Sequence, residues 1–306
     1  MIDYQLPRVS VIIPTCHRND LLAKCLDRLA PDIQTLPPEQ YEVIVTDDGS
    51  RSTAEQLVRE HYPWVHWIEG PRRGPAANRN CGVKAVQGKW VAFTDDDCLP
   101  QPGWLNALLS AIQNGTSTYE GKTTCDQGLS SPLYEAPINL TGGNLWSCNF
   151  MIECLVFREI GGFDEAFTMP AVEDTDLRER LEKRGEKRRF VETAVVDHPP
   201  RRQPSGRRLG EKYEANVQYW YKTGHRGSFF LPFLKHIKHR LYIIRGFGSS
   251  PDAGIALLSV LIESWYVLPR LRSWRTKYCS LYPVRSSSLD SDIGIEHVTS
   301  SSQCSL

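Results

Sequence analysis

Residues 90–97 of the chain are Trp90-Val91-Ala92-Phe93-Thr94-Asp95-Asp96-Asp97. The first five form an apolar run of the length of a buried strand, and three carboxylates follow it directly. Carboxylates packed this tightly repel one another. They form either a solvated acidic turn or a site for a divalent cation, because Mg²⁺ and Mn²⁺ take oxygen ligands from one or two carboxylates together with a substrate phosphate. The surrounding sequence favours the cation site.

Strand and helix patterns alternate over the first hundred residues. The predicted strands are Val9–Pro14, Tyr41–Thr46, Val65–Ile68 and Trp90–Thr94, and the predicted helices between them cover residues 19–29, Thr53–Tyr62 and Pro75–Val86. This order predicts an α/β fold with a mostly parallel sheet, helices on both faces and right-handed crossovers. Ligands in such sheets bind beyond the carboxyl ends of the strands. The polar segments lie at those ends: Pro14-Thr15, Asp47-Asp48, Arg72-Arg73-Gly74 and Asp95–Asp97.

The pattern changes after residue 114. We expect a helix near Gly103–Asn114, irregular chain over Gly115–Gly143, a strand at Cys148–Phe157, a helix at Asp176–Lys183, a strand at Arg189–Val196 and helices from Arg207 onward. Two apolar helix faces stand out in the last part, around Phe230–Ile244 and Ile255–Leu268, with Lys and Arg interleaved. The longest uncharged apolar stretch, Ala253–Ile262, is too short to span a bilayer.

The net charge of zero conceals an asymmetry. Residues 1–200 carry 20 Lys/Arg against 29 Asp/Glu, whereas residues 201–284 carry 15 against 4. A basic C-terminal third predicts contact with something anionic, such as a membrane surface or a phosphate. Nine cysteines without a Cys-x-x-Cys pair favour a reducing compartment, and the N-terminus shows no signal-peptide pattern. These features predict a cytoplasmic protein, with peripheral association at the cytoplasmic membrane face as a further expectation.

The chain resembles the family-2 glycosyltransferases of the GT-A fold over about residues 8–200. The matching stretches, taken in their order and spacing, are Val9–Arg18, Val43–Ser50, Gly74–Gly82, Phe93–Pro100 and Gly161–Gly185 with its Val172-Glu173-Asp174-Thr175-Asp176-Leu177 core. The resemblance implies a Rossmann-like GT-A domain over residues 1–206 that binds a nucleotide-diphosphate-sugar donor and transfers the sugar, with inversion, to a sugar or lipid-linked acceptor in polysaccharide or glycolipid synthesis. Residues 207–284 are then a basic amphipathic helical extension, and residues 285–306 a Ser-rich disordered tail.

The resemblance also assigns nucleotide-binding roles. Asp47 would accept a hydrogen bond from the base and Asp48 would support the turn, although both could simply stabilise an Asx-turn. Pro14 and Thr15 would line the same pocket, unless Pro14 only ends its strand. Arg79 would approach the nucleotide or its phosphates, with an ordinary exposed helix arginine as the alternative.

A metal site and a catalytic base complete the implied set. Asp97 would bind Mn²⁺ or Mg²⁺ directly, Asp95 would contact the ribose or sugar and stand near the metal, and Asp96 would point away. Asp174 would be the general base, with Glu173 and Asp176 raising its pKa; all three could instead favour a helix N-terminus. His198 could reach the metal or be structural.

Other functions and partners remain open at this point. A sugar nucleotidyltransferase is disfavoured because no glycine-rich loop follows the first strand, and a non-catalytic relative is disfavoured because Asp95, Asp97 and Asp174 are all present. No nucleic-acid-binding module is recognisable. Arg201, Arg202, Arg207 and Arg208 lie on a Pro/Gly/Ser-rich segment that would clamp the diphosphate or bind lipid headgroups. The C-terminal helices would bind an anionic membrane, cover the catalytic domain or form a homodimer.

Overall fold

The computed structural model describes residues 6–283 of the 306-residue chain. Its strands are β1 (Val9–Thr15), β2 (Tyr41–Asp47), β3 (Val65–Glu69), β4 (Trp90–Phe93), β5 (Leu99–Pro100), β6 (Thr118–Thr124), β7 (Tyr134–Glu135), β8 (Phe150–Glu153), β9 (Arg188–Asp197) and β10 (Arg201–Arg202). Its helices are α1 (Asn19–Leu29), α2 (Glu55–His61), α3 (Pro75–Val83), α4 (Trp104–Ser110), α5 (Cys154–Glu159), α6 (Glu173–Arg184), α7 (Gly206–Lys222), α8 (Phe230–Gly246) and α9 (Pro251–Leu281). The predicted tail, residues 285–306, lies outside the described part.

One eight-stranded sheet organises the first two hundred residues, in the order β3-β2-β1-β4-β8-β6-β9-β5. The first four of these strands are parallel, as the alternating sequence pattern predicts. The pairs β4–β8, β6–β8 and β5–β9 are antiparallel, and β6–β9 is parallel. The predicted mostly parallel sheet is therefore confirmed, with antiparallel strands inserted beyond β4.

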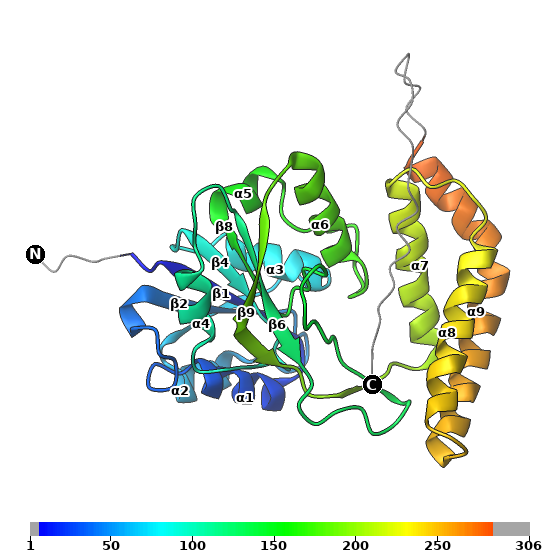
Figure 1. The fold of residues 1–306 in the computed structure, drawn as a ribbon, viewed down its shortest axis with the longest axis horizontal. Helices are drawn as coiled ribbons and strands as arrows, with labels where there is room; N and C mark the ends of the chain where they lie inside the picture. The colour runs from blue at the N-terminus through cyan, green and yellow to red at the C-terminus, as the bar shows by residue number, and fades with distance from the viewer. Residues whose placement is uncertain (1–5, 284–306) are drawn as a thin grey trace, which may run out of the picture.

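Helices cover both faces of the sheet (Figure 1). Along β1 and β4 the side chains alternate between two apolar clusters: Val11 and Ala92 join one cluster with residues of α1 and α4, whereas Ile12 and Phe93 join the other with residues of α3, α5 and α6. Successive side chains of a strand point to opposite faces of the sheet, and helices cover both faces, so these strands carry apolar residues on both sides.

Two expected elements differ from the structure. The segment expected to be irregular contains the central strand β6, which is rich in threonine and buries Glu120. The Glu120 carboxylate accepts hydrogen bonds from the backbone of residues 143–145 and from the Asn139 side chain, so a charged residue is buried where a sequence pattern would place none. The strand expected at Cys148–Phe157 ends at Glu153, and α5 follows it.

The three last helices form a layer beside the sheet domain (Figure 1). They pack on one another through an aromatic cluster that includes Tyr213, Tyr221, Phe233, Trp274 and Tyr278. By length and composition, α9 could cross a membrane: its mean hydropathy reaches 1.4 over an 18-residue window, of which 22% is buried. The uncharged stretch Ala253–Ile262 is only part of this longer helix, which continues through Glu263.

Candidate active site

A cavity of about 640 Å³ opens at the carboxyl ends of β1, β2 and β4, where the sequence places its polar segments. Of the predicted site residues, Pro14, Thr15, Asp48, Arg79 and Asp95 line it. Seven cationic side chains share this lining with three carboxylates: Arg18, Arg72, Arg79, Arg201, Arg202, Arg208 and Lys212 stand against Asp48, Asp95 and Glu135. A concave surface with this excess of positive charge suits a diphosphate.

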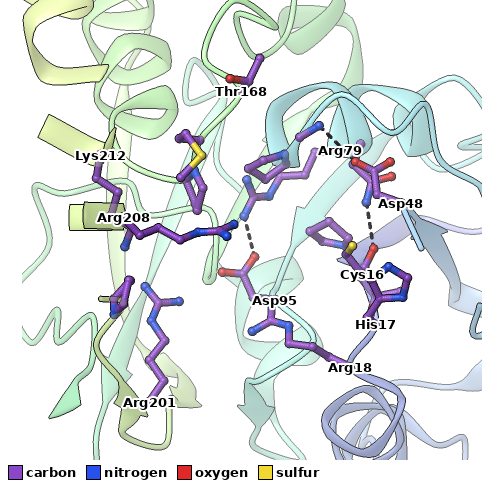
Figure 2. A pocket seen from close by; sticks show the side chains of 18 of the residues that line it. Cys16, His17, Arg18, Asp48, Arg79, Asp95, Thr168, Arg201, Arg208 and Lys212 are labelled. Carbon is purple, nitrogen blue, oxygen red and sulfur yellow. Dashed lines mark hydrogen bonds and ion pairs between the residues drawn. The ribbon is translucent and has the colours of Figure 1, made fainter. Parts of the chain in front are cut away.

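Arg79 is buried at the base of this cavity, which corrects the alternative of an exposed helix arginine. Its guanidinium lies 2.6 Å from Asp95 and 3.3 Å from Glu173. It extends from α3, which begins beyond Gly74 (Figure 2). Gly74 has a φ of +94°, and a Cβ there would lie 2.3 Å from the carbonyl oxygen of Thr168. Only glycine therefore lets the start of α3 approach the loop that forms the opposite wall.

Arg18 is a site residue that the sequence analysis missed. Its guanidinium contacts Asp96 at 2.5 Å and Asp97 at 2.8 Å, and the Thr15 hydroxyl donates to Asp96 at 2.7 Å. Asp96 is fully buried, and burial raises its pKa to about 7. Asp96 does not point away into a turn; it anchors Thr15 and Arg18 beneath the cavity. Arg18 stands three residues after the β1 strand end, a position that could have identified it.

Asp47 and Asp48 differ from the roles expected for them, because Asp48 lines the cavity and Asp47 does not. Asp47 is buried, does not line the cavity and accepts hydrogen bonds from the backbone N–H groups of Gly49 and Ala54. This geometry corresponds to the loop-stabilising alternative, because both carboxylate oxygens already accept hydrogen bonds. Asp48 lines the cavity and accepts from the amides of Arg72 and Gly74 at 2.8 and 3.2 Å.

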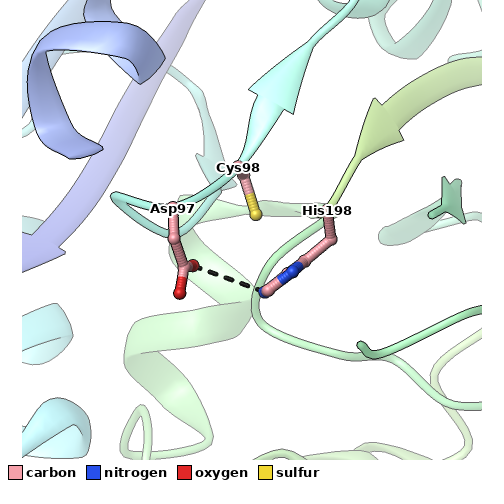
Figure 3. A group of neighbouring side chains, drawn as sticks. All are labelled: Asp97, Cys98 and His198. Atoms are coloured by element: carbon pink, nitrogen blue, oxygen red, sulfur yellow. Dashed lines mark ion pairs between the residues drawn. The ribbon is translucent and has the colours of Figure 1, made fainter. Parts of the chain in front are cut away.

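Asp97, Cys98 and His198 bring three ligand atoms within 4.8 Å of one another (Figure 3). Asp97 Oδ1 and His198 Nε2 lie 3.3 Å apart, and within residues 6–283 neither has a hydrogen-bond partner of good geometry. Burial lowers the pKa of His198, but the interaction with Asp97 outweighs it and raises that pKa to about 9. Two buried, unsatisfied ligand atoms from β9's end and the acidic turn fit a divalent cation. Asp95, by contrast, is paired with Arg79.

Asp97 is buried, although it lies in the acidic segment that follows β4. Its side chain is 7% exposed, and it faces Arg18, His198 and, at 3.8 Å, Arg201. Burial opposes ionisation of Asp97, but the interactions with His198 and Arg18 prevail and lower its pKa. Removal of this carboxylate would leave the buried His198 without its charged partner, whereas Arg18 and Arg201 keep Asp96 and Glu135.

Asp174 lies in the first turn of α6. One of its oxygens, Oδ2, accepts from the amide and hydroxyl of Ser147 at 3.0 and 3.3 Å. The other, Oδ1, is buried and has no hydrogen-bond partner among the described residues. Burial, followed by the negative charge of Glu173, raises the pKa of Asp174 to about 7. The carboxylate of Asp176, which is expected to raise the pKa of Asp174, is instead paired with Arg180 and Lys222.

The helical layer contributes directly to the cavity. Arg208 and Lys212 project from α7, and Arg201 from β10, toward the same space as Arg79 (Figure 2). Arg207 and Arg208 lie in the first turn of α7, in agreement with the helices expected from Arg207 onward. A partly buried carboxylate with a raised pKa, a buried aspartate–histidine pair whose atoms fit a cation and a strongly positive cavity together suit a nucleotide-sugar transferase of the GT-A class.

Comparisons with known proteins agree with this class. Residues 10–131 match the family model described as glycosyl transferase family 2. The chain is similar to glycosyltransferase AglE of Haloferax volcanii, at 28% identity over 70% of this chain and 75% of the relative. It is also similar to the pre-mycofactocin glycosyltransferase of Mycobacterium tuberculosis, at 34% identity over 64% of this chain, but it spans only 43% of that relative's length.

A solved structure extends the likeness to the fold. The mannosyltransferase PcManGT from Pyrobaculum calidifontis, in complex with GDP-Man and Mn²⁺, superposes with a TM-score of 0.54 at 19% identity over 90% of this chain and 85% of that one. The superposition thus includes part of the helical region as well as the sheet domain.

Proposed function

We propose that this protein transfers a glycosyl group from a nucleotide-diphosphate sugar to an acceptor hydroxyl, with inversion at the anomeric carbon. The observation that carries the proposal is the positively lined cavity. Of its arginines, Arg79 is paired with Glu173, the neighbour of Asp174, and Arg18 and Arg201 face Asp97 of the Asp97–His198 pair. The cationic side chains match the charge of a diphosphate. The related mannosyltransferase with GDP-Man and Mn²⁺ supports a nucleotide-sugar donor.

The residues of this chain divide the chemistry between them. Arg79 and Arg208 hold and orient the diphosphate, and Asp174 Oδ1 accepts the proton of the acceptor hydroxyl. The acceptor oxygen forms its bond to the anomeric carbon as the bond to the diphosphate oxygen breaks, so the diphosphate leaves with the electron pair. One positioned base is sufficient for this single displacement.

Asp97 and His198 are the residues that would hold Mn²⁺ or Mg²⁺, with Cys98 as a third neighbour of the pair. When bound, the cation neutralises charge on the departing diphosphate. We expect Asp95 to remain with Arg79 and to face the ribose or the sugar, because it lines the cavity and is already ion-paired.

Calorimetric titration of the full-length protein with UDP and GDP, with and without Mn²⁺, tests the donor and cation assignments together. We expect micromolar to millimolar binding of one nucleotide, weakened when EDTA is added, and hydrolysis of the matching nucleotide sugar. Binding of a nucleoside triphosphate in preference to the diphosphate, with pyrophosphate release from a sugar phosphate, would instead support the nucleotidyltransferase. Full turnover in EDTA would contradict the cation role.

We further propose that α8 and α9 place the protein on an anionic membrane surface. Large apolar side chains are exposed along these helices: Tyr242, Leu258, Leu261, Ile262, Trp265 and Leu268 are 41–79% exposed. Basic residues lie among them, in agreement with the charge of this part of the chain. Because α9 also packs against α7 and α8 and buries Glu263, a position in the membrane interface suits it better than a crossing.

A further inference from the structure

A second cavity, of about 380 Å³, adjoins the nucleotide cavity. The two share four lining residues: Glu135, Pro170, Arg201 and Lys212. The second cavity therefore continues the first along the groove between the sheet domain and the helical layer. A ligand there would lie beside the donor and not in its place.

Two segments next to Asp174 line this second cavity. Trp146 lines it, and the next residue, Ser147, donates both hydrogen bonds to Asp174. Ala171 also lines it, and its amide donates to Glu173 at 2.8 Å. A ligand in the cavity thus contacts the two segments that position the proposed base.

The walls combine aromatic rings with polar groups. Trp146, Tyr213 and His236 supply rings, whereas Asn216, Lys212 and Glu263 supply donors and acceptors. A pyranose ring has the same mixed character, because apolar C–H faces alternate with hydroxyl edges. Rings pack against such faces, and amide or charged groups bind the hydroxyls.

The helical side of this cavity is held rigidly. Glu263 is fully buried on α9 and accepts a hydrogen bond from His236 Nε2 at 2.8 Å, and it is ion-paired with Arg240. The His236 ring lies 5.5 Å from the ring of Tyr213, centroid to centroid. Side chains locked by such neighbours preserve a binding geometry.

We propose that the second cavity binds the acceptor as a pyranose ring, and that α7, α8 and α9 select it. This inference rests on the proposed glycosyl transfer. It names the acceptor as a saccharide, free or attached to a lipid, and it gives the helical layer a role in acceptor recognition.

The test compares transfer with donor hydrolysis in the full-length protein. The matching nucleotide sugar and Mn²⁺ are supplied with a panel of p-nitrophenyl hexopyranosides, which represent free saccharides, or octyl hexopyranosides, which represent lipid-linked ones. Asn216→Ala and His236→Ala are matched with Gln218→Ala on α7 and His239→Ala on α8, whose positions do not line the cavity. We expect the KM for the glycoside to rise about tenfold in the first pair, as for a lost hydrogen bond, and to stay unchanged in the controls.

The outcomes separate the inference from the function on which it rests. Donor hydrolysis and nucleotide binding that persist, with no glycoside in the panel accelerating nucleotide release, would overturn the saccharide assignment. Equal KM values in Asn216→Ala, His236→Ala and the wild type would overturn the location. Absence of both donor binding and hydrolysis would overturn the proposed function itself. Faster transfer to octyl than to nitrophenyl glycosides identifies the lipid-linked source, and the reverse identifies the free one.

Discussion

Asp96 and Asp174 both have pKa values raised to about 7 by burial, yet their surroundings give them different tasks. Asp96 accepts from Thr15 and is paired with Arg18, so its oxygens are engaged. Asp174 has one oxygen engaged with Ser147 and one without a partner in the described chain. Only the second arrangement leaves an oxygen that can receive a proton from an acceptor. A raised pKa alone therefore does not identify a base; the free oxygen does.

We expect transfer to depend on the ionisation of Asp174. The carboxylate is the form that accepts a proton, so the rate should rise as the pH increases through about 7 and level off above it. Asp174→Asn should reduce transfer by ~10²–10⁴ and remove this pH dependence. Initial rates across the pH range, with calorimetric nucleotide titration as the control, measure both. Lost nucleotide affinity combined with surviving transfer would rule out this role.

Asp97→Asn should weaken both cation binding and the fold. The variant keeps the size of the side chain but leaves the buried His198 without its charged partner, which typically costs about 1–3 kcal/mol, whereas Arg18 keeps its ion pair with Asp96. Mn²⁺ titration followed by electron paramagnetic resonance measures the first effect, and chemical denaturation in EDTA the second. Asp126→Asn, near the same sheet edge, is the control. Unchanged Mn²⁺ affinity in a folded Asp97→Asn protein would exclude the ligand role.

At the scale of secondary-structure elements, α9 is joined to α8 by a buried ion pair. Glu263 is fully buried, and Arg240 is 10% exposed at its side chain. We expect Glu263→Gln to destabilise the protein by about 3–5 kcal/mol, because it leaves Arg240 buried and unpaired. Denaturation curves measure this, with Glu211→Gln, whose partner Arg207 is exposed, expected to change by less than about 0.5 kcal/mol. Equal curves for both variants would show that the pair does not hold the two helices together.

The strands and helices before residue 100 could be predicted from the regular spacing of their apolar residues. These residues pack in two clusters, one on each face of the sheet. β6 could not be predicted, because its burial depends on Glu120 being satisfied by a loop some twenty residues away. The strand-end positions likewise indicated Thr15, Asp48, Asp95 and Asp97. The inward orientation of Asp47 and the contribution of Lys212 depend on tertiary contacts, which no local pattern encodes.

At the scale of the whole molecule, the helical layer has two faces with different surroundings. One supplies Arg208 and Lys212 to the nucleotide cavity, and the other exposes Leu261 and Trp265. Removing residues from Arg207 onward would therefore remove part of the cavity wall. A truncation at this point, which the charge pattern alone would recommend, does not separate membrane binding from nucleotide binding.

Substitutions on the exposed face separate the two properties. The double variant Leu261→Glu/Trp265→Glu should lose sedimentation with phosphatidylserine-containing vesicles while it retains nucleotide binding. Leu155→Glu, which is equally exposed on the sheet domain, should sediment like the wild type. Wild-type binding should weaken with salt, since each basic residue near the surface contributes on the order of 1 kcal/mol. A wild-type protein that stays in the supernatant and elutes as a dimer would favour self-association.

The contacts of Arg18 have a consequence for the order in which ligands assemble. The carboxylates of Asp96 and Asp97 share Arg18 as a counter-ion. The positive charge of Arg18 therefore offsets the repulsion between the two carboxylates without a cation. Coordination of a cation by both oxygens of Asp97 would require Arg18 to release Oδ2, whereas Oδ1 already faces His198. A donor diphosphate offers the freed guanidinium a new anion at the same moment. We therefore expect initial-rate kinetics to show that the donor binds to the protein as its complex with the cation. Arg18 then exchanges Asp97 for the diphosphate, and Asp97 exchanges Arg18 for the cation.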